Sequence, residues 1–282
     1  MKSIVVYQAY GPSFILEQNL FSVLSLFRQH KDFTQVEKIL IYTDNQPYFA
    51  SYLGSCPQVQ YEPITAERLA AWRGDIQFVH RVKIEMILDA AVKFPQHNLF
   101  YLDGDTYFTK DPSDLLTQID ARHSIMHEAE NIVNLGRDPL SKKVAKFLKK
   151  FEFEHAGKKM QIPVSMTMWN AGVLGISPAF FPSLKFVLNL TDQSYSKYKK
   201  HVMEQMAFSY FLAAQSQILS GADYVHHYWR QKEEYGTLIR EYLGVHANLN
   251  AGLKNFDSIS WPPHPVPKKS FYQKLTEKLF KG

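Results

Sequence analysis

Apolar runs that alternate with helical patterns organise the chain. The largely apolar residues 2–10 predict a buried strand that ends at Gly11-Pro12, and Ser13 can cap a helix that continues to about His30. Further predicted strands are 38–43, 59–64, 99–102, 124–127 and 171–176, and further predicted helices are 67–72, 78–94, 138–151, 178–190 and 200–214. Apolar strands that alternate with helices predict an α/β fold with a mostly parallel sheet that is covered on both faces.

Composition narrows the class of protein. The 282 residues are 45% hydrophobic and 14% aromatic, which excludes intrinsic disorder. The single cysteine, Cys56, excludes an internal disulfide and a thiolate zinc site. No apolar run approaches the roughly 20 residues of a membrane-spanning helix, and the first apolar run is too short for a signal peptide. We expect a cytoplasmic protein with one domain at 1–260 and a proline-rich linker and basic tail at 261–282.

The positive charge is concentrated at the C-terminus. The net charge is +5, and residues 268–282 hold five lysines against one glutamate, so the rest of the chain is near +1. Aromatic residues recur between these lysines at helical spacing, which predicts an amphipathic tail on an anionic membrane surface. A solvated terminal helix packed on the body is the alternative. A second lysine cluster at 142–159 is expected to be a solvated helix face. The near-neutral body predicts no nucleic-acid binding.

Two carboxylates flank a glycine directly after the predicted strand 99–102, in the sequence Asp103-Gly104-Asp105. Ligands of open α/β sheets bind at the carboxyl ends of strands, so these acids lie where a site is expected. Carboxylate oxygens suit Mg²⁺ or Mn²⁺, and such an ion could be shared with a substrate diphosphate. Because Asp-Gly is also common in ordinary turns, an acidic turn is the alternative.

Three later segments carry candidate binding residues. The small side chains of Asn170-Ala171-Gly172 leave room for a ligand against the backbone, although a buried strand with a packing glycine has the same pattern. Glu204-Gln205 begins a predicted helix, where an acid also suits the helix dipole. His226 and His227 are adjacent near a strand end, so one imidazole is a candidate metal ligand while the other is buried.

Together these segments resemble the nucleotide-sugar-dependent glycosyltransferases of the GT-A fold, and most closely glycosyltransferase family eight. The resemblance continues from the first strand through His80-Arg81-Val82-Lys83, the Asp103–Asp105 segment, Asn170-Ala-Gly-Val-Leu174 and Glu204-Gln205 to the late His226. It implies a Rossmann-like mixed sheet, mostly parallel, with helices on both faces. It also implies an enzyme, a hexosyltransferase.

The resemblance assigns roles to individual residues. Asp103 and Asp105 would hold Mn²⁺ (or Mg²⁺) on the donor diphosphate, and His226 or His227 would complete the metal site. Glu204-Gln205 would lie near the anomeric carbon as the catalytic pair. The expected donor-binding residues are Tyr7, Tyr10, Asp44, Arg81, Lys83, Asp103, Gly104, Asn170, Ala171, Gly172 and Lys232. Among them, Tyr7 or Tyr10 is expected to stack on the base, Asp44 to bind the nucleoside and Lys232 to face the leaving phosphate.

The expected reaction is metal-dependent transfer of a sugar from a nucleotide-diphosphate sugar, with a UDP-sugar favoured. The expected acceptor is a saccharide or glycolipid in cell-envelope polysaccharide or lipopolysaccharide synthesis, and the resemblance favours retention of configuration. Met206 stands where the family has a third acid, so a non-catalytic carbohydrate-binding protein is one alternative. A sugar-phosphate nucleotidyltransferase is another, although Tyr10-Gly11-Pro12-Ser13 is a poor match to a glycine-rich phosphate loop.

Overall fold

The structure is a computed structural model that describes residues 1–30 and 32–262. The predicted basic tail at 268–282 lies outside the described residues, as does most of the predicted linker. Within the described part of the chain, no helix is both long and apolar enough to cross a bilayer.

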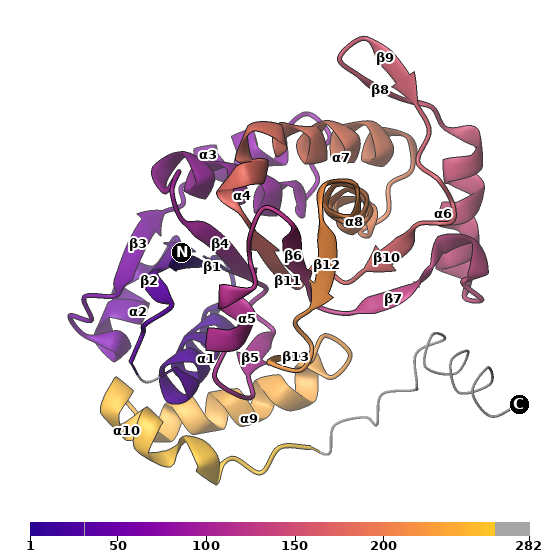
Figure 1. Ribbon diagram of the computed structural model, residues 1–282. Helices are drawn as coiled ribbons and strands as arrows, with labels where there is room; N and C mark the ends of the chain where they lie inside the picture. Colours follow the sequence, from indigo (N-terminus) through magenta and orange to yellow (C-terminus); the bar gives the residue numbers. More distant parts are fainter. Residues whose placement is uncertain (31, 263–282) are drawn as a thin grey trace, which may run out of the picture.

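A seven-stranded mixed sheet forms the centre of the molecule (Figure 1). Its strand order is β12-β6-β11-β4-β1-β2-β3. The strands are β1 (Ser3–Ala9), β2 (Val36–Thr43), β3 (Val59–Pro63), β4 (Asn98–Leu102), β6 (His123–Met126), β11 (Val173–Ile176) and β12 (Gln217–Ser220). Only β11 runs antiparallel to its two neighbours in this sheet, and the other pairs are parallel. The predicted α/β class with a mostly parallel sheet is therefore confirmed.

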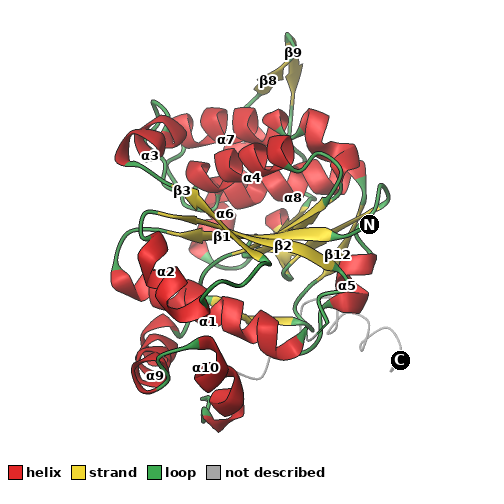
Figure 2. Ribbon diagram, turned by 90° about the vertical axis from the view of Figure 1, so that its left-hand side faces the viewer, coloured by secondary structure: helices red, strands yellow, loops and turns green. Residues whose placement is uncertain are grey.

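Helices cover both faces of the sheet (Figure 2). One face carries α3 (Ala66–Arg73), α4 (Arg81–Lys93), α6 (Pro139–Lys150), α7 (Lys185–Lys197) and α8 (Met203–Gln215). The other carries α1 (Ser13–Gln29), α2 (Gln46–Leu53), α5 (Ser113–Thr117), α9 (Lys232–Val245) and α10 (Leu249–Asn255).

Alternate residues of β1 supply the two hydrophobic cores. Ile4 and Val6 belong to the core that includes α4 and α8, whereas Val5 and Tyr7 belong to the core that includes α1. Successive side chains of a strand point to opposite faces, so a strand that is covered on both sides is apolar throughout. This explains why β1, β2 and β4 were evident as continuous apolar runs.

Short elements that the sequence pattern did not predict surround the main sheet. Three two-stranded sheets pair β5 (Thr106–Phe108) with β13 (Val225–His227), β7 (Ala129–Ile132) with β10 (Thr167–Trp169), and β8 (Phe153–His155) with β9 (Lys158–Met160). Single-turn helices are η1 (Val133–Leu135) and η3 (Phe256–Ser258). The six-residue η2 (Pro178–Ser183) lies within the helix predicted at 178–190. Segments of three or four residues are too short to show a period, which is why the pattern missed them.

Two predicted boundaries differ from the structure. The helix predicted at 178–190 divides into η2 and α7, because Pro182 lies inside the first segment and cannot donate a helical hydrogen bond. The predicted linker begins with Trp261, which is packed on the body: its ring centroid lies 5.1 Å from that of Tyr107 and 5.2 Å from that of Tyr235.

Because Phe100 is fully buried at the centre of β4, Phe100→Ala is expected to lower the free energy of unfolding by about 3–5 kcal/mol. Urea denaturation followed by circular dichroism measures the change. Val92→Ala on the 81% exposed surface of α4 is the control and should change stability by less than about 0.5 kcal/mol. Equal effects of the two substitutions would contradict the placement of β4 in the core.

Candidate functional site

The two carboxylates lie where the strand order of the main sheet reverses. The chain adds β2 and β3 on one side of β1 and then places β4 on its other side. Asp103 follows β4 directly, and Asp105 precedes β5. A crevice forms outside the carboxyl ends of strands at such a reversal, which is where open α/β sheets bind ligands.

Strand β13 brings one histidine to these acids. It pairs antiparallel with β5, so that His226 lies opposite Tyr107 and His227 lies opposite Thr106. Adjacent residues of a strand point to opposite faces. The His226 ring therefore packs against the rings of Tyr107 and Tyr235, at 5.3 Å and 5.6 Å between centroids, while His227 faces the acids. Of the two histidines, His227 is therefore the candidate metal ligand. His226 packs among aromatic rings instead.

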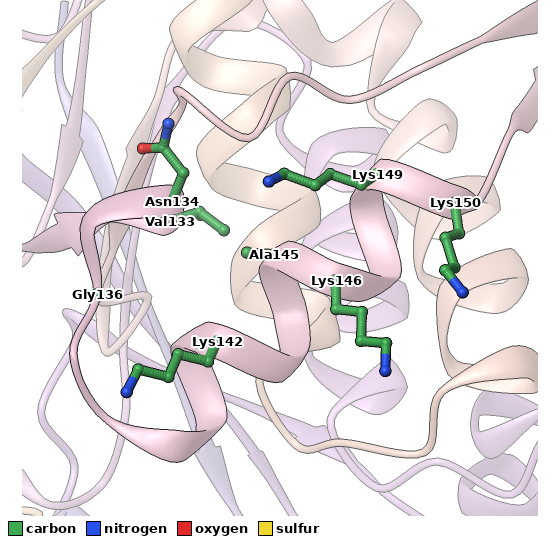
Figure 3. Close-up of a pocket in the computed structure, with 8 residues that line it drawn as sticks. All are labelled: Val133, Asn134, Gly136, Lys142, Ala145, Lys146, Lys149 and Lys150. Carbon is green, nitrogen blue, oxygen red and sulfur yellow. The ribbon is translucent and has the colours of Figure 1, made fainter.

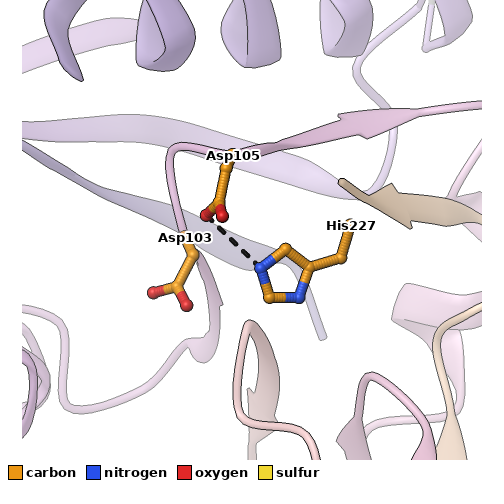
Figure 4. A group of neighbouring side chains, drawn as sticks. All are labelled: Asp103, Asp105 and His227. Carbon is orange, nitrogen blue, oxygen red and sulfur yellow. Dashed lines mark ion pairs between the residues drawn. The ribbon is translucent and has the colours of Figure 1, made fainter. Parts of the chain in front are cut away.

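Asp103, Asp105 and His227 form a compact group (Figure 4). One ligand atom from each of these residues lies within 4.8 Å of the other two. Within the group, His227 Nε2 lies 3.3 Å from Asp105 Oδ1. Two carboxylates and an imidazole are ligands that suit Mn²⁺ or Mg²⁺ better than a soft thiophilic metal. The residues present therefore fit a divalent cation.

Asn170 orients the imidazole of His227. Its Oδ1 accepts hydrogen bonds from the backbone N–H of Gly172 at 2.9 Å and from Nδ1 of His227 at 3.0 Å. With Nδ1 engaged by Asn170, Nε2 is the ring nitrogen that faces Asp105. A partner of this kind sets the tautomer and orientation of a metal-binding histidine. Asn170 thus has a role behind the metal ligands, and its predicted contact with the donor stays a prediction.

Gly172 leaves the space that His227 occupies. A Cβ atom at this position would lie 2.3 Å from Cε1 and 2.4 Å from Nδ1 of His227. Its neighbour Ala171 is buried, and the Ala171 carbonyl oxygen accepts a hydrogen bond from Lys83 at 3.1 Å. Gly104 is similarly close to a side chain, because a Cβ there would lie 2.3 Å from the amide nitrogen of Asn19.

Lys83 is a buried cation between two acids. Its Nζ lies 3.1 Å from Asp103 Oδ1 and 2.9 Å from Glu204 Oε1. Burial alone would lower the pKa of Lys83, but the charges of Asp103 and Glu204 outweigh it and raise that pKa. For Glu204 burial is the largest effect and raises its pKa, although Lys83 opposes this.

Lys232 supplies a second, half-exposed cation from the first turn of α9. Its Nζ lies 2.9 Å from Asp105 Oδ2. Burial would raise the pKa of Asp105, but the hydrogen bond and charge of His227, together with the charge of Lys232, lower that pKa overall. Asp105 is therefore a carboxylate at neutral pH.

Glu130 is a site residue that the sequence reasoning missed. Its two carboxylate oxygens accept hydrogen bonds from Asn170 Nδ2 at 3.1 Å and from Gln205 Nε2 at 2.9 Å. It lies on β7, shortly after β6 ends, and it joins the loop of Asn170 to α8. The histidine and two glutamates in the segment His127-Glu128-Ala129-Glu130, which follows a predicted strand, were the available signal.

Two predicted donor-binding residues lie apart from this group or have other partners. Tyr7 is fully buried in the core beside α1, where Ser22 donates a hydrogen bond to its hydroxyl, so it offers no surface for a base. Arg81 forms ion pairs with Glu85 and Asp192 and donates to the carbonyl of Trp72, so its guanidinium ties together α3, α4 and α7. The stacking role of Tyr7 is therefore wrong, because its side chain has no exposed surface. The donor contact of Arg81 stays a prediction, and its guanidinium already has three partners in the protein.

The remaining two candidates lie beyond the carboxyl ends of β1 and β2. Tyr10 is half-buried, and its hydroxyl accepts a hydrogen bond from Gln8. Asp44 is exposed and accepts one from the backbone N–H of Gly11 at 3.0 Å. Both remain predicted donor-binding residues, and Tyr10 is now the sole candidate for base stacking.

No protein-family model and no curated protein matches the chain. Solved structures do. The galactosyltransferase LgtC in complex with donor and acceptor sugar analogues is 13% identical, with a TM-score of 0.49, over 76% of this chain and 72% of that chain. The glycosyltransferase GlyE of Streptococcus pneumoniae TIGR4 is 16% identical, with a TM-score of 0.46, over 95% of this chain and 67% of that chain. The bifunctional glycosyltransferase WbbM is 11% identical, with a TM-score of 0.44, over 77% and 38% of the two chains.

Gly172→Ala is expected to displace the His227 imidazole and weaken Mn²⁺ binding, because the added methyl group would occupy the position of the ring. Isothermal titration with Mn²⁺ measures the affinity, and circular dichroism checks the fold. Gly244→Ala on α9 is the matched control: a Cβ there meets no atom within 4 Å, so this variant should bind Mn²⁺ normally. Unchanged Mn²⁺ affinity in Gly172→Ala would contradict the ligand role of His227.

His127 makes folding sensitive to acid. Burial lowers its pKa to about 4, and the charge of His227 adds to this effect. Its Nε2 donates to the carbonyl of Val225 at 3.0 Å. Between pH 6.5 and 4 the unfolded chain binds a proton at this residue that the folded chain does not, so the free energy of unfolding falls as the pH is lowered through this range.

His127→Gln can keep the hydrogen bond to Val225 but does not titrate, so its stability should decline less between pH 6.5 and 4. Urea denaturation at a series of pH values measures both proteins. The exposed His201→Gln is the control for loss of an imidazole. Parallel pH profiles of wild type and His127→Gln would show that His127 is not the responsible group.

Proposed function

We propose that the protein is a metal-dependent glycosyltransferase that transfers a sugar from a nucleotide-diphosphate sugar, with a UDP-sugar favoured, to a saccharide or glycolipid acceptor. The observation that carries the proposal is the group of Asp103, Asp105 and His227, with ligand atoms within 4.8 Å of one another at the end of β4. Oxygen and nitrogen ligands of this kind suit a cation that also binds a diphosphate.

Transfer breaks a bond between the anomeric carbon and a phosphate oxygen, so negative charge grows on the leaving diphosphate. A divalent cation held by Asp103, Asp105 and His227 supplies Lewis-acid stabilisation of that charge when it is bound. The Lys232 ammonium is half-exposed beside Asp105 and supplies a second positive charge at the same place. Preorganised charges of this type lower the barrier most where water is excluded.

Lys83 and Glu204 support the site from within. Both side chains are about 95% buried and paired with each other, so Glu204 is a positioning residue for Lys83 and does not face solvent. Gln205, the next residue, is partly exposed and donates its amide N–H to Glu130, which leaves its carbonyl oxygen as an acceptor. We therefore assign Gln205 as the member of the pair that lies near the anomeric carbon, in a reaction with retention of configuration.

An acceptor of the cell envelope is part of the same proposal, with the protein in the cytoplasm and peripheral on the membrane. The supporting feature is the basic, aromatic segment 268–282 of the sequence. Comparing full-length protein with a variant that lacks 268–282 in a sedimentation assay with anionic vesicles tests this part separately from catalysis.

A thermal-shift panel of UDP-, GDP-, CDP- and dTDP-sugars, each with and without Mn²⁺, tests the proposal. A ligand that binds only the folded state raises the midpoint of unfolding, so one nucleotide class should do so and should require Mn²⁺. Pyrophosphate release from a sugar phosphate and a nucleoside triphosphate would instead indicate a nucleotidyltransferase. Donor binding without any metal-dependent hydrolysis or transfer would indicate a non-catalytic carbohydrate-binding protein.

Asp105→Asn is expected to abolish Mn²⁺-dependent hydrolysis of the donor while the protein stays folded, because it removes a charged ligand. Asn170→Ala should weaken Mn²⁺ binding by about 10- to 100-fold, because it removes the partner of a metal ligand. Asp114→Asn on the exposed face of α5 is the matched control and should leave hydrolysis unchanged. Full activity in Asp105→Asn would overturn the metal assignment.

A further inference from the structure

A hollow of about 280 Å³ lies between α6 and the segment that begins with η1 (Figure 3). We call it the lysine hollow, because four of its eight lining residues are lysines. It is lined by Val133, Asn134, Gly136, Lys142, Ala145, Lys146, Lys149 and Lys150. Val133 and Ala145 are buried and apolar, whereas all four lysines are exposed.

The lysines of this hollow have no acidic partners. Within residues 1–30 and 32–262, no carboxylate lies within 4.0 Å of Lys142, Lys146, Lys149 or Lys150. Other lysines are paired, for example Lys93 with Glu62 and Asp89. The nearby Asp138 is engaged by Ser141 and by the backbone at the start of α6. No acidic side chain of the described residues therefore pairs with the positive charges of the hollow.

Helix electrostatics do not explain all four lysines. Lys149 and Lys150 lie in the last turn of α6, where the helix dipole favours a cation. Lys142 lies near the N-terminus of the helix, where the dipole disfavours one. Lys142 and Lys146, and then Lys146 and Lys150, are four residues apart, a spacing at which like charges on a helix repel. An anion in the hollow would relieve this repulsion.

The hollow is connected to the site through β7. Glu130, which binds Asn170 and Gln205, begins a short segment that reaches Asn134 at the hollow. Four residues span at most about 14 Å. A second, smaller pocket has Glu130 and Gln205 in its lining and shares Val133 with the lysine hollow. One elongated saccharide can therefore reach both places.

We propose that the lysine hollow binds a phosphate group of the acceptor saccharide, so that the reacting hydroxyl lies near Glu130 and Gln205. This inference rests on the proposed glycosyl transfer. Several ammonium groups without an arginine suit a multiply charged anion, because lysine binds phosphate as a point charge whereas planar carboxylates favour the fork of arginine.

The test uses the full chain and inorganic phosphate as the probe, with sodium chloride at equal ionic strength as the reference. Phosphate should raise the thermal midpoint of the wild type beyond the chloride reference. Lys146→Glu/Lys149→Glu should lose this increase. Lys143→Glu/Lys158→Glu carries the same charge change on lysines outside the hollow and should keep it. Lys232→Ala should also keep it, which separates the hollow from the cation beside Asp105.

Glucose 6-phosphate and vesicles distinguish the source of the phosphate. If the acceptor carries it, glucose 6-phosphate raises the midpoint where glucose does not, and the increase is lost in Lys146→Glu/Lys149→Glu. The alternative result is that glucose 6-phosphate has no effect, while the protein binds phosphatidylglycerol vesicles but not phosphatidylcholine vesicles and needs these lysines to do so. The phosphate group then belongs to a lipid surface, and the acceptor assignment is overturned. A phosphate response that survives in Lys146→Glu/Lys149→Glu overturns the hollow itself.

Donor with Mn²⁺ is measured on the same wild-type sample. A donor response without a phosphate response would contradict the lysine hollow alone. If phosphate raises the thermal midpoint and donor with Mn²⁺ does not, the proposed glycosyl transfer is contradicted. The hollow would then be an anion-binding site without that function.

Discussion

A single buried ammonium group holds the candidate site together. Lys83 projects from α4 and contacts Asp103 after β4, the carbonyl of Ala171 before β11, and Glu204 on α8. Its Nζ also lies 5.1 Å from the centre of the Tyr101 ring. Removing one partner of a buried ion pair leaves the other charge uncompensated, at a cost of about 3–5 kcal/mol. The positions of three separate chain segments thus depend on one charge that the fold cannot leave unpaired.

A second set of contacts converts that scaffold into a metal-binding geometry. Asp105 follows Asp103 by two residues, and its carbonyl accepts the backbone N–H of Tyr228 at 3.1 Å, which joins the β5 loop to the end of β13. Asn170 then orients the His227 ring, and the missing side chain of Gly172 gives that ring room. His227 is therefore held from behind by a hydrogen bond and by close packing, and the backbone of Asp105 is held by a hydrogen bond from Tyr228.

Charge is distributed in a way that matches these roles. Inside the site, Lys83 lies between Glu204 and Asp103, and Lys232 lies beside Asp105, so each of these charges has an opposite neighbour. The lysines of α6 have none within the described chain. The paired charges hold the side chains of the candidate site in place. The unpaired lysines of α6 lie where an external anion can supply the opposite charge.

The sequence by itself indicated six of the seven strands of the main sheet, the helices α1, α3, α4, α6, α7 and α8, and the two acids at the end of β4. It did not indicate β12 or the helices α2, α5, α9 and α10. Buried parallel strands are apolar throughout and are followed by ligand-binding loops, so the sequence alone is enough to predict them. Lys83 and Lys232 were also singled out as donor-binding residues. The structure places both beside the acids, and their contact with a donor stays a prediction.

Only the tertiary structure decided which histidine faces the acids, because that choice depends on the register of a three-residue strand against β5. It also turned Arg81 into a link between helices, moved Tyr7 into the core and revealed Glu130. In each case the deciding partner lies more than 10 residues away along the chain: Asp192 for Arg81, Ser22 for Tyr7 and Asn170 for Glu130. Periodicity and local spacing carry no information about such partners, because these contacts form only when distant segments pack together.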